Sequence, residues 1–292
     1  AVMSAPSGIQ MYDRDGKLAV DLHGDNTHFN PGSCGTAVYD VKTDTHRHST
    51  TRDLLTLVKI ADALENMDMQ STAVVPYDVN PRFQGPFRLF AVLANSTKPV
   101  VTGTLGSDDF SKMKDMLVAV RGSEEMLREK PLAIFDCCPS PALKWGRDRS
   151  EDLIRCGDYG IPAQFISMPQ PGLSSPTSLY DSLVQHTAET KSGVVISQLA
   201  NPGAPLIYGG SPTMSTGQNA LLGNSGTAKF DAAYVAIGKG AGMPTQAYLG
   251  MSDSKVPDVQ AGAEKLIGFM MAVFSGVNNV SGPGMLDSEN CQ

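Results

Sequence analysis

The spacing of hydrophobic residues along the chain changes near residue 50. Before that point, short alternating runs such as 17–22 stand among Gly, Asp, Asn and Thr, which is typical of hairpins and loops. From Thr51 onward, apolar residues such as Leu54, Val58 and Ala61 recur at helical spacing. The pattern predicts a β/loop segment over residues 1–50, packed on a larger domain that spans 51–292.

Apolar runs of strand length alternate with amphipathic stretches in the larger domain. The expected strands are Thr72–Val75, Pro99–Leu105, Leu132–Phe135, Ala163–Ile166, Val194–Leu199, Leu206–Tyr208, Thr245–Leu249 and Asn279–Ser281. Helices are expected at Asp109–Val120, Glu151–Arg155, Leu179–Thr187, Ala228–Ile237 and Val259–Phe274.

The repeat length favours parallel strands joined by helices. Pro99, Pro131 and Pro162 each stand at or just before the start of an expected strand. A strand–helix unit occupies about 30 residues, which is close to the spacing of these prolines. Eight strands predict an α/β fold of the closed (β/α)8, TIM-like barrel type. An open doubly wound sheet has the same periodicity and stays a second interpretation.

In such a barrel, functional groups lie on the loops that follow the strands. These loops are rich in Pro, Gly and polar residues, and they hold three acids: Asp78, Asp136 and Asp253. A carboxylate at a strand end is either catalytic or a helix cap, and the sequence does not separate the two. Aromatic rings bind ammonium groups, so Tyr208 and Tyr248 at strand ends are candidate ligands as well as ordinary packing residues.

Composition excludes several classes of protein. The formal net charge is −7 with no basic run, so no nucleic-acid partner is expected. The longest apolar stretch, 266–277, is too short to cross a bilayer, and the first residues do not resemble a secretion signal. Five cysteines without a CxxC spacing favour a reducing compartment, so we expect a cytoplasmic protein.

Common catalytic and metal motifs are missing. Neither a phosphate-binding glycine loop nor a G-x-S-x-G elbow occurs in its proper setting. His46 and His48, or the adjacent Cys137 and Cys138, lack the spacing of a zinc site, so no bound metal is expected.

Several loops resemble those of the trimethylamine methyltransferase family. The matching runs are 12–17, 76–79, Ser140-Pro141, 198–209, 252–265 and 281–286, and 252–265 is the longest and most specific. The resemblance covers essentially the whole chain. It implies that residues 1–292 correspond to the middle of a longer family member, with a final helix expected after Gln292.

Family members of this type are TIM-like barrels that methylate the Co(I) corrinoid of a small partner protein. The trimethylamine enzymes carry pyrrolysine just before their Ser-Asp-x-Lys run, where this chain has Met251. A thioether lacks the electrophilic imine that helps to present a tertiary amine. A quaternary ammonium already carries its charge and leaves as a neutral amine, so the resemblance implies a glycine betaine-like donor.

The resemblance also implies a site. We expect Met251, Asp253 and Gln198 to act as catalytic or orienting groups, with the ammonium held by Tyr77, Tyr208 and Tyr248. His28 and Arg82 are the expected donors to a betaine carboxylate.

The expected partners are a corrinoid protein and a small quaternary amine, and a homo-oligomer is considered. Alternatives are an enzyme for trimethylamine or another amine, a zinc-dependent corrinoid methyltransferase, and a non-catalytic barrel that binds quaternary amines.

Overall fold

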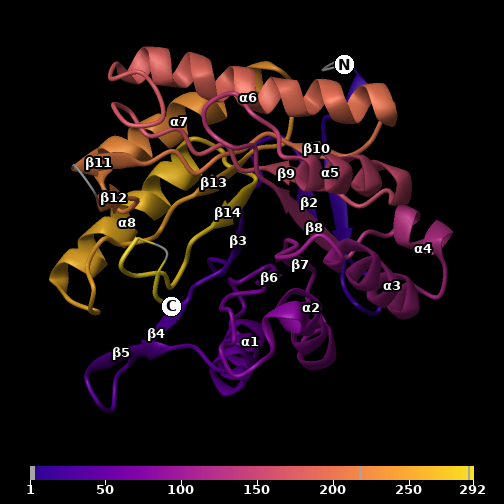
Figure 1. The fold of residues 1–292 in the computed structure, drawn as a ribbon, viewed down its shortest axis with the longest axis horizontal. Helices are drawn as coiled ribbons and strands as arrows, with labels where there is room; N and C mark the ends of the chain where they lie inside the picture. Colours follow the sequence, from indigo (N-terminus) through magenta and orange to yellow (C-terminus); the bar gives the residue numbers. More distant parts are fainter. Residues whose placement is uncertain (1–3, 217–218, 289) are drawn as a thin grey trace.

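Eight short parallel strands surround a common axis in the computed structural model, which describes residues 4–216, 219–288 and 290–292 (Figure 1). The barrel strands are β3 (His28–Asn30), β6 (Gln70–Ser71), β7 (Val100–Thr102), β8 (Ala133–Cys137), β9 (Ala163–Phe165), β10 (Leu206–Ile207), β13 (Gln246–Tyr248) and β14 (Asn279–Ser281). Ladders join them in the orders β6 to β10 and β13–β14–β3.

Two seams close the barrel. Between β3 and β6, the Met69 amide donates to the Phe29 carbonyl over 3.1 Å. Between β10 and β13, the Gln246 amide donates to the Tyr208 carbonyl over 2.9 Å, and Tyr208 forms a parallel bridge with Thr245. The sheet is therefore continuous around the axis, which confirms the predicted (β/α)8 barrel.

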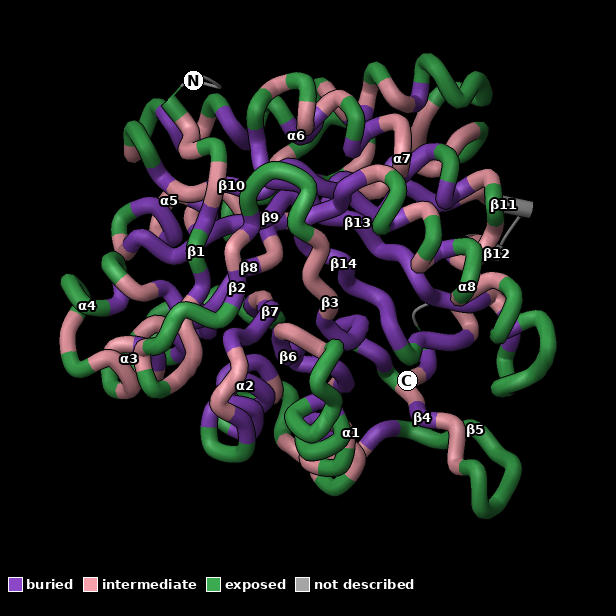
Figure 2. Tube along the Cα trace, turned by 180° about the vertical axis from the view of Figure 1, so that it is seen from behind, coloured by how far each residue is buried: buried purple, intermediate pink, exposed green. Residues whose placement is uncertain are grey.

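Helices cover the outside of the barrel in chain order, each packed against the next. They are α1 (Thr51–Ala63), α2 (Gln84–Asn95), α3 (Asp109–Arg121), α4 (Glu124–Glu129), α5 (Arg147–Tyr159), α6 (Leu179–Ala200), α7 (Ser225–Gly240) and α8 (Val259–Phe274). A 3-10 turn, η2 (Pro81–Phe83), precedes α2. The main core lies between strands and helices, and Figure 2 shows the buried strands inside an exposed outer layer.

Prolines set the start of several strands, as the sequence indicated. Pro99 and Pro162 each stand one residue before a barrel strand, where no ladder N–H is needed. Their carbonyls accept hydrogen bonds from the neighbouring strand, from the Gln70 amide at 2.7 Å and the Phe135 amide at 2.9 Å. The α5 helix stops just upstream at Gly160, whose φ of 67° is the left-handed conformation that glycine favours.

One expected strand is wrong and one barrel strand was not expected. Residues 194–199 belong to the long helix α6, which continues from Leu179 to Ala200. The eighth strand is β3, which pairs in parallel with β14 and lies inside the segment 1–50. The boundary expected at residue 50 therefore does not separate the barrel from the N-terminal segment.

The first hairpin closes the amino end of the barrel. Strands β1 (Ile9–Tyr12) and β2 (Leu18–Leu22) pair antiparallel. The hairpin's buried side chains pack against inward-facing barrel residues, in one apolar cluster of Ile9, Met11, Val20, Leu22, Met69, Val101, Ile134 and Ile207. The amino end of the lumen is thus filled by apolar side chains.

Two further hairpins lie on the carboxyl side. One consists of β4 (Ala37–Asp40) and β5 (Thr45–His48) and follows β3. The other consists of β11 (Met214–Thr216) and β12 (Asn219–Leu221) and follows β10.

Candidate active site

Loop length distinguishes the two ends of the barrel. On the carboxyl side, β9 is joined to α6 by residues 166–178, and β10 to α7 by 208–224. On the amino side, α5 reaches β9 through 160–162. Long loops at the carboxyl ends of barrel strands are where active sites form. We therefore build the candidate site there.

A polar layer crosses the middle of the lumen. The carboxylate of Asp136 on β8 accepts a hydrogen bond from the side-chain amide of Gln164 on β9. The side-chain oxygen of Gln164 accepts a hydrogen bond from the side-chain amide of Asn279 on β14 over 2.7 Å. The side-chain oxygen of Asn279 in turn accepts one from the side-chain amide of Asn30 on β3, also over 2.7 Å. Asn30 also donates to Ser281 over 3.1 Å. Barrel lumens are usually filled by branched apolar residues, so this chain of side chains marks the lumen as a functional region.

Asp136 is the ionisable group of this layer. Strand alternation turns Phe135 and Cys137 toward the helices and Asp136 toward the lumen. Its side chain is deep in the protein yet keeps some contact with solvent, and Gly103 beside it contributes no side chain. Burial raises the pKa of Asp136 to about 7, although the hydrogen bond from Gln164 and the charge of Arg88 oppose the rise. A carboxyl group poised near neutrality is typical of functional sites.

An apolar wall stands beside the polar layer. Its buried members come from four loops or strand ends: Ile166, Leu222, Tyr248, Met251 and Met285. Cys138 and Met168 pack against them and are only partly buried. Cys138 lies two residues past Asp136, so the wall and the polar layer meet at the end of β8.

Tyr248 and Met251 occupy the centre of this wall. The Tyr248 hydroxyl makes a 3.2 Å hydrogen bond with the hydroxyl of Ser33, in the loop after β3. Met251 is 1% exposed and lies in the loop after β13. A Cβ on Gly282 would approach the Met251 Cγ to 2.6 Å, so glycine leaves the room that this thioether needs. The two predicted residues Tyr248 and Met251 are thus brought together.

Asp253 connects loops at the carboxyl end of the barrel, the region that we call the mouth. One oxygen of its carboxylate accepts from the Gly223 amide at 2.9 Å and from the Ser288 hydroxyl at 2.7 Å. Glu264 on α8 accepts from the Ser252 hydroxyl at 2.6 Å and from the Asp253 amide at 2.8 Å. The structure therefore gives Asp253 and Glu264 positions that fix the loop carrying Met251.

Arg88 is a fully buried cation near the same end of the barrel. From α2 its guanidinium donates to the carbonyl and the hydroxyl of Thr72 and to the Cys34 sulfur. Its Nε and Nη1 have no hydrogen-bond partner among the described residues. A buried guanidinium with spare donors is suited to a nearby carboxylate, and its charge acts on Asp136.

Two of the three expected cage tyrosines lie elsewhere. Tyr208 is fully buried but faces the helices, and its hydroxyl donates to Thr187 on α6 over 3.3 Å. Tyr77 is 51% exposed and stacks on His48, with ring centroids 4.1 Å apart. Of the three, only Tyr248 lines the mouth wall, so the structure does not assemble the expected cage.

Three other expected residues also lie away from Met251. His28 begins β3, at the amino end, where its Nδ1 is 3.3 Å from the Asp68 carboxylate. Gln198 is in α6 and supports the turn before β10, accepting from the Gly203 amide at 2.8 Å. Gln198 was expected within the strand Val194–Leu199, and that expectation is wrong because these residues belong to α6. Arg82 is exposed in η2, on the carboxyl side.

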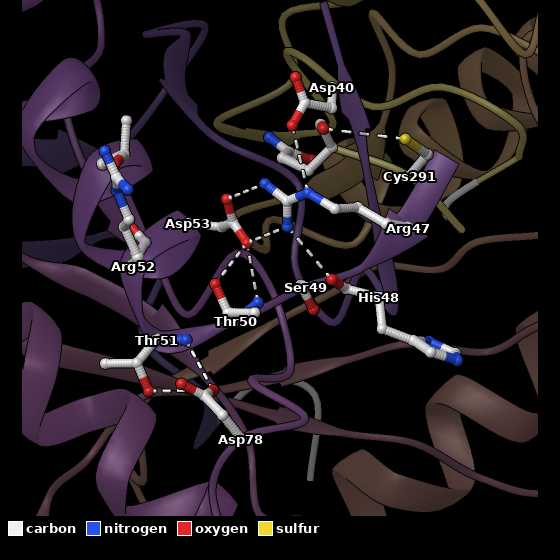
Figure 3. Close-up of polar contacts among 12 residues, drawn as sticks. Asp40, Arg47, His48, Ser49, Thr50, Thr51, Arg52, Asp53, Asp78 and Cys291 are labelled. Carbon is white, nitrogen blue, oxygen red and sulfur yellow. Dashed lines mark hydrogen bonds and ion pairs between the residues drawn. The ribbon is translucent and has the colours of Figure 1, made fainter. Parts of the chain in front are cut away.

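The acid Asp78 caps a helix (Figure 3). Its carboxylate accepts from the Thr51 amide at 2.7 Å, at the start of α1. Beside it, Arg47 on β5 donates two hydrogen bonds to Asp53, at 2.7 and 2.8 Å, and ties the hairpin to the helix. The Arg47 hydrogen bond is the main reason that the pKa of Asp53 falls to about 2. This cluster is structural, which resolves the two interpretations of Asp78.

Sequence reasoning missed most of the polar layer. Gln164, Asn279 and Asn30 stand in short strands, where single polar residues carried no motif. The alternation of side chains along a strand could have located them. Gln164 and Asn279 each adjoin apolar residues of the outer core, so their own side chains face the lumen.

Two features are absent from the part of the chain that the structure describes. No three His, Cys, Asp or Glu side chains gather as ligands for a metal ion there. No described helix combines the length and apolar character needed to cross a membrane.

The fold defines a TIM-barrel protein, and the loops at the carboxyl ends of its strands hold the candidate site. Among solved structures, dihydropteroate synthases show the same fold. The Xanthomonas albilineans protein superposes with a TM-score of 0.56 at 13% identity, covering 97% of this chain and 94% of that one. The Coxiella burnetii protein also gives 0.56, at 12% identity and the same coverage.

The chain belongs to the trimethylamine methyltransferase (MTTB) family, whose profile matches residues 1–289. It is 33% identical to a trimethylamine methyltransferase of Desulfitobacterium hafniense over 98% of the chain, and 32% identical to one of Methanosarcina barkeri. A glycine betaine methyltransferase of Desulfitobacterium hafniense is 27% identical over 95% of the chain. The chain spans only 58–59% of the length of these relatives.

Proposed function

We propose that this protein transfers a methyl group from a quaternary amine, of the glycine betaine type, to the Co(I) corrinoid of a partner protein. The observation that carries the proposal is the meeting of Met251 and Tyr248 in one wall, next to the polar layer that contains Asp136. Family membership supplies the reaction class, and the mouth supplies groups suited to a cation.

Asp136 and Tyr248 would bind the ammonium group. An ionised carboxylate attracts the positive charge, and the face of an aromatic ring does so through its quadrupole. A bound cation in turn favours the charged form of Asp136, which burial disfavours. One ring and one carboxylate take the place of the three-tyrosine cage expected from the sequence.

Met251 favours a quaternary over a tertiary amine. The trimethylamine enzymes of the family carry pyrrolysine where this chain has Met251, and a buried thioether offers no electrophile to a free amine. A quaternary amine needs none, since its leaving group is already neutral. Met251, Met285 and Met168 would surround the methyl groups with polarizable sulfur.

A betaine carboxylate needs a donor. Arg88 suits this role better than His28 or Arg82, because it has unpartnered N–H groups and acts electrostatically on Asp136.

The carboxyl face has features that fit a docked partner. Exposed apolar side chains stand on its loops and in the helical turns next to them: Tyr77, Phe83, Leu105, Leu143, Leu173, Tyr180, Val256 and Val259. The corrinoid supplies the nucleophilic cobalt that takes the methyl group. The chain's own residues orient one methyl outward, exclude water and hold the amine in line, which is catalysis by positioning. The free cysteines of the chain fit a cytoplasmic setting.

The test follows the cobalt spectrum anaerobically, with the full gene product, a Co(I) corrinoid and either glycine betaine or trimethylamine. Methyl-Co(III) formed with betaine alone supports the proposal. Methylation with trimethylamine alone overturns the argument from Met251 in favour of a tertiary-amine enzyme. No reaction with either amine, combined with betaine binding by calorimetry, favours a non-catalytic quaternary-amine-binding barrel.

A further inference from the structure

Gln246 is the lumen-facing residue of β13 that lies one level deeper than Tyr248. Ala247 and Leu249 belong to the outer core. Alternation therefore turns Gln246 and Tyr248 toward the lumen, about 6–7 Å apart along the strand. Gln246 is fully buried and pairs in register with Asn279 of the polar layer. It thus stands between that layer and the apolar wall of the mouth.

The side-chain amide of Gln246 is bound at its oxygen and unbound at its nitrogen. Its Oε1 accepts a hydrogen bond from the Gly210 amide over 3.1 Å. This contact fixes which way the amide points, because Nε2 in the same place would set one donor against another. A Cβ on Gly209 would overlap Oε1, so a glycine allows the close approach. The Nε2 of Gln246 is left buried, with no hydrogen-bond partner among the described residues.

Helix α7 holds this arrangement from outside the barrel. The Tyr234 hydroxyl lies 3.1 Å from the carbonyl oxygens of both Gly210 and Gln246. The strand and the loop that fix the Gln246 side chain are therefore tied to one hydroxyl group. A donor held in this way loses little freedom when it meets a ligand. Gln246 is thus a pre-organised N–H donor in the lumen.

An unpartnered buried donor is suited to an acceptor on a ligand. Buried polar atoms nearly always have a partner, so each exception needs a reason. An ionised carboxylate only accepts hydrogen bonds. Among the described residues of the polar layer, Asn30 Oδ1 also lacks a partner, but it is an acceptor and would oppose a carboxylate. The β13 side of the lumen is therefore the side that suits a ligand's carboxylate.

We propose that Gln246 is a specificity-determining residue, whose Nε2 donates a hydrogen bond to the carboxylate of the quaternary amine. This inference rests on the proposed function and extends it from the ammonium end of the substrate to the other end. In a betaine, two bonds of about 1.5 Å join the ammonium nitrogen to the carboxyl carbon. Adding a C–O bond and a hydrogen bond of about 2.9 Å gives a reach comparable with the step from Tyr248 to Gln246. A carboxylate accepts several hydrogen bonds, so this donor adds to Arg88 and does not replace it.

The test measures the binding of two amines to the full gene product by calorimetry, without a corrinoid. Glycine betaine has a carboxylate, and tetramethylammonium has none. In Gln246→Glu an oxygen still accepts from Gly210, while a second oxygen replaces the donor. We expect the Kd for glycine betaine to rise about 10- to 100-fold, as for the loss of a hydrogen bond to a charged group. The Kd for tetramethylammonium should not rise.

Two further variants complete the experiment. Gln246→Met has a similar length and no proton to donate, so the same selective loss of glycine betaine binding is expected. Gln198→Glu is the matched control, because Gln198 is also buried and its Oε1 also accepts from a backbone amide, but it lies in α6 away from the mouth. This control should leave the ratio of the two Kd values unchanged. Circular dichroism confirms that each variant is folded.

Equal losses for both amines in the Gln246 variants, or no loss for either, would overturn the inference. The proposed function would still stand in that case, because the native protein binds a quaternary amine. A native protein that binds neither amine would overturn the proposed function and this inference together.

Discussion

Glu264 on α8 accepts a 2.6 Å hydrogen bond from the hydroxyl of Ser252, the residue directly after Met251. The same carboxylate oxygen accepts from the Asp253 amide. A helix thus holds the loop that presents Met251 to the mouth. The long run 252–265 by which the sequence resembles its family contains both ends of this contact.

Removing the Glu264 carboxylate should loosen that loop. Glu264→Ala leaves the Ser252 hydroxyl and the Asp253 amide without their acceptor, at a cost of about 1–3 kcal/mol in the free energy of unfolding. Amine turnover should fall further than stability alone explains. Urea unfolding and methyl transfer measure the two effects. Gln260→Ala is the control, because it removes only an exposed hydrogen bond to the other Glu264 oxygen. Similar losses of stability and turnover in both variants would contradict the role of Glu264 in holding the loop that carries Met251.

Met251 should act through its volume and polarizability. Met251→Ala opens a cavity in a buried wall and should cost about 2–5 kcal/mol of stability, with loss of methyl transfer. Met251→Leu nearly keeps the volume and should cost less than about 1.5 kcal/mol. Thermal unfolding and turnover with betaine compare the pair. If the Ala variant keeps full activity, Met251 does not shape the amine pocket.

Asp136 should make catalysis pH-dependent. Its pKa of about 7 means that the carboxylate needed for the ammonium forms as pH rises through neutrality, so kcat/KM should increase from pH 6 to pH 8 and then level off. Asp136→Asn should lower kcat/KM about 10- to 100-fold, as expected for losing a charged interaction of about 1.5–3 kcal/mol. The remaining activity should not change with pH across this range. A pH profile that persists in the Asn variant would assign the titration to another group.

His186 should make stability pH-dependent instead. It is fully buried and stacks on Tyr234 with centroids 4.3 Å apart. Burial lowers its pKa from 6.5 to about 3, so below pH 6.5 the unfolded chain takes up a proton that the folded protein does not. The contribution of neutral His186 to the free energy of unfolding is fully present above pH 6.5. It falls as the pH is lowered, by about 2 kcal/mol at pH 5.

His186→Phe keeps a ring in the same place and removes this titration. Melting temperatures of the two proteins should therefore converge or cross between pH 7 and pH 5, because the native protein loses more stability. Parallel curves would show that His186 does not titrate with unfolding.

The number of strands was predictable, but one of their positions was not. Val194, Val195 and Ile196 are β-branched and were interpreted as a strand, yet they continue α6, where tertiary packing overrides local propensity. β3 was missed because its residues are His, Phe and Asn, and its inward side faces a polar lumen rather than an apolar one. Composition alone cannot reveal which side of a strand faces the lumen.

The same limit applies to the site. Met251 and Tyr248 share one apolar cluster because a family motif and a strand end located both at the same end of the barrel, and their roles stay a prediction. Tyr208 follows a strand too, but alternation turns it toward α6, and its direction depends on a register that the sequence does not display. Arg88 and Glu264 come from helices and reach the mouth only through the fold.

The hairpin of β1 and β2 closes the amino end of the barrel lumen with apolar side chains. In the proposed reaction, the amine and the partner protein therefore share a single route. The amine has to enter first, and the demethylated amine departs after the partner has moved off. Kinetics should be sequential and ordered, and an excess of the partner should inhibit turnover by covering the opening before the next amine arrives.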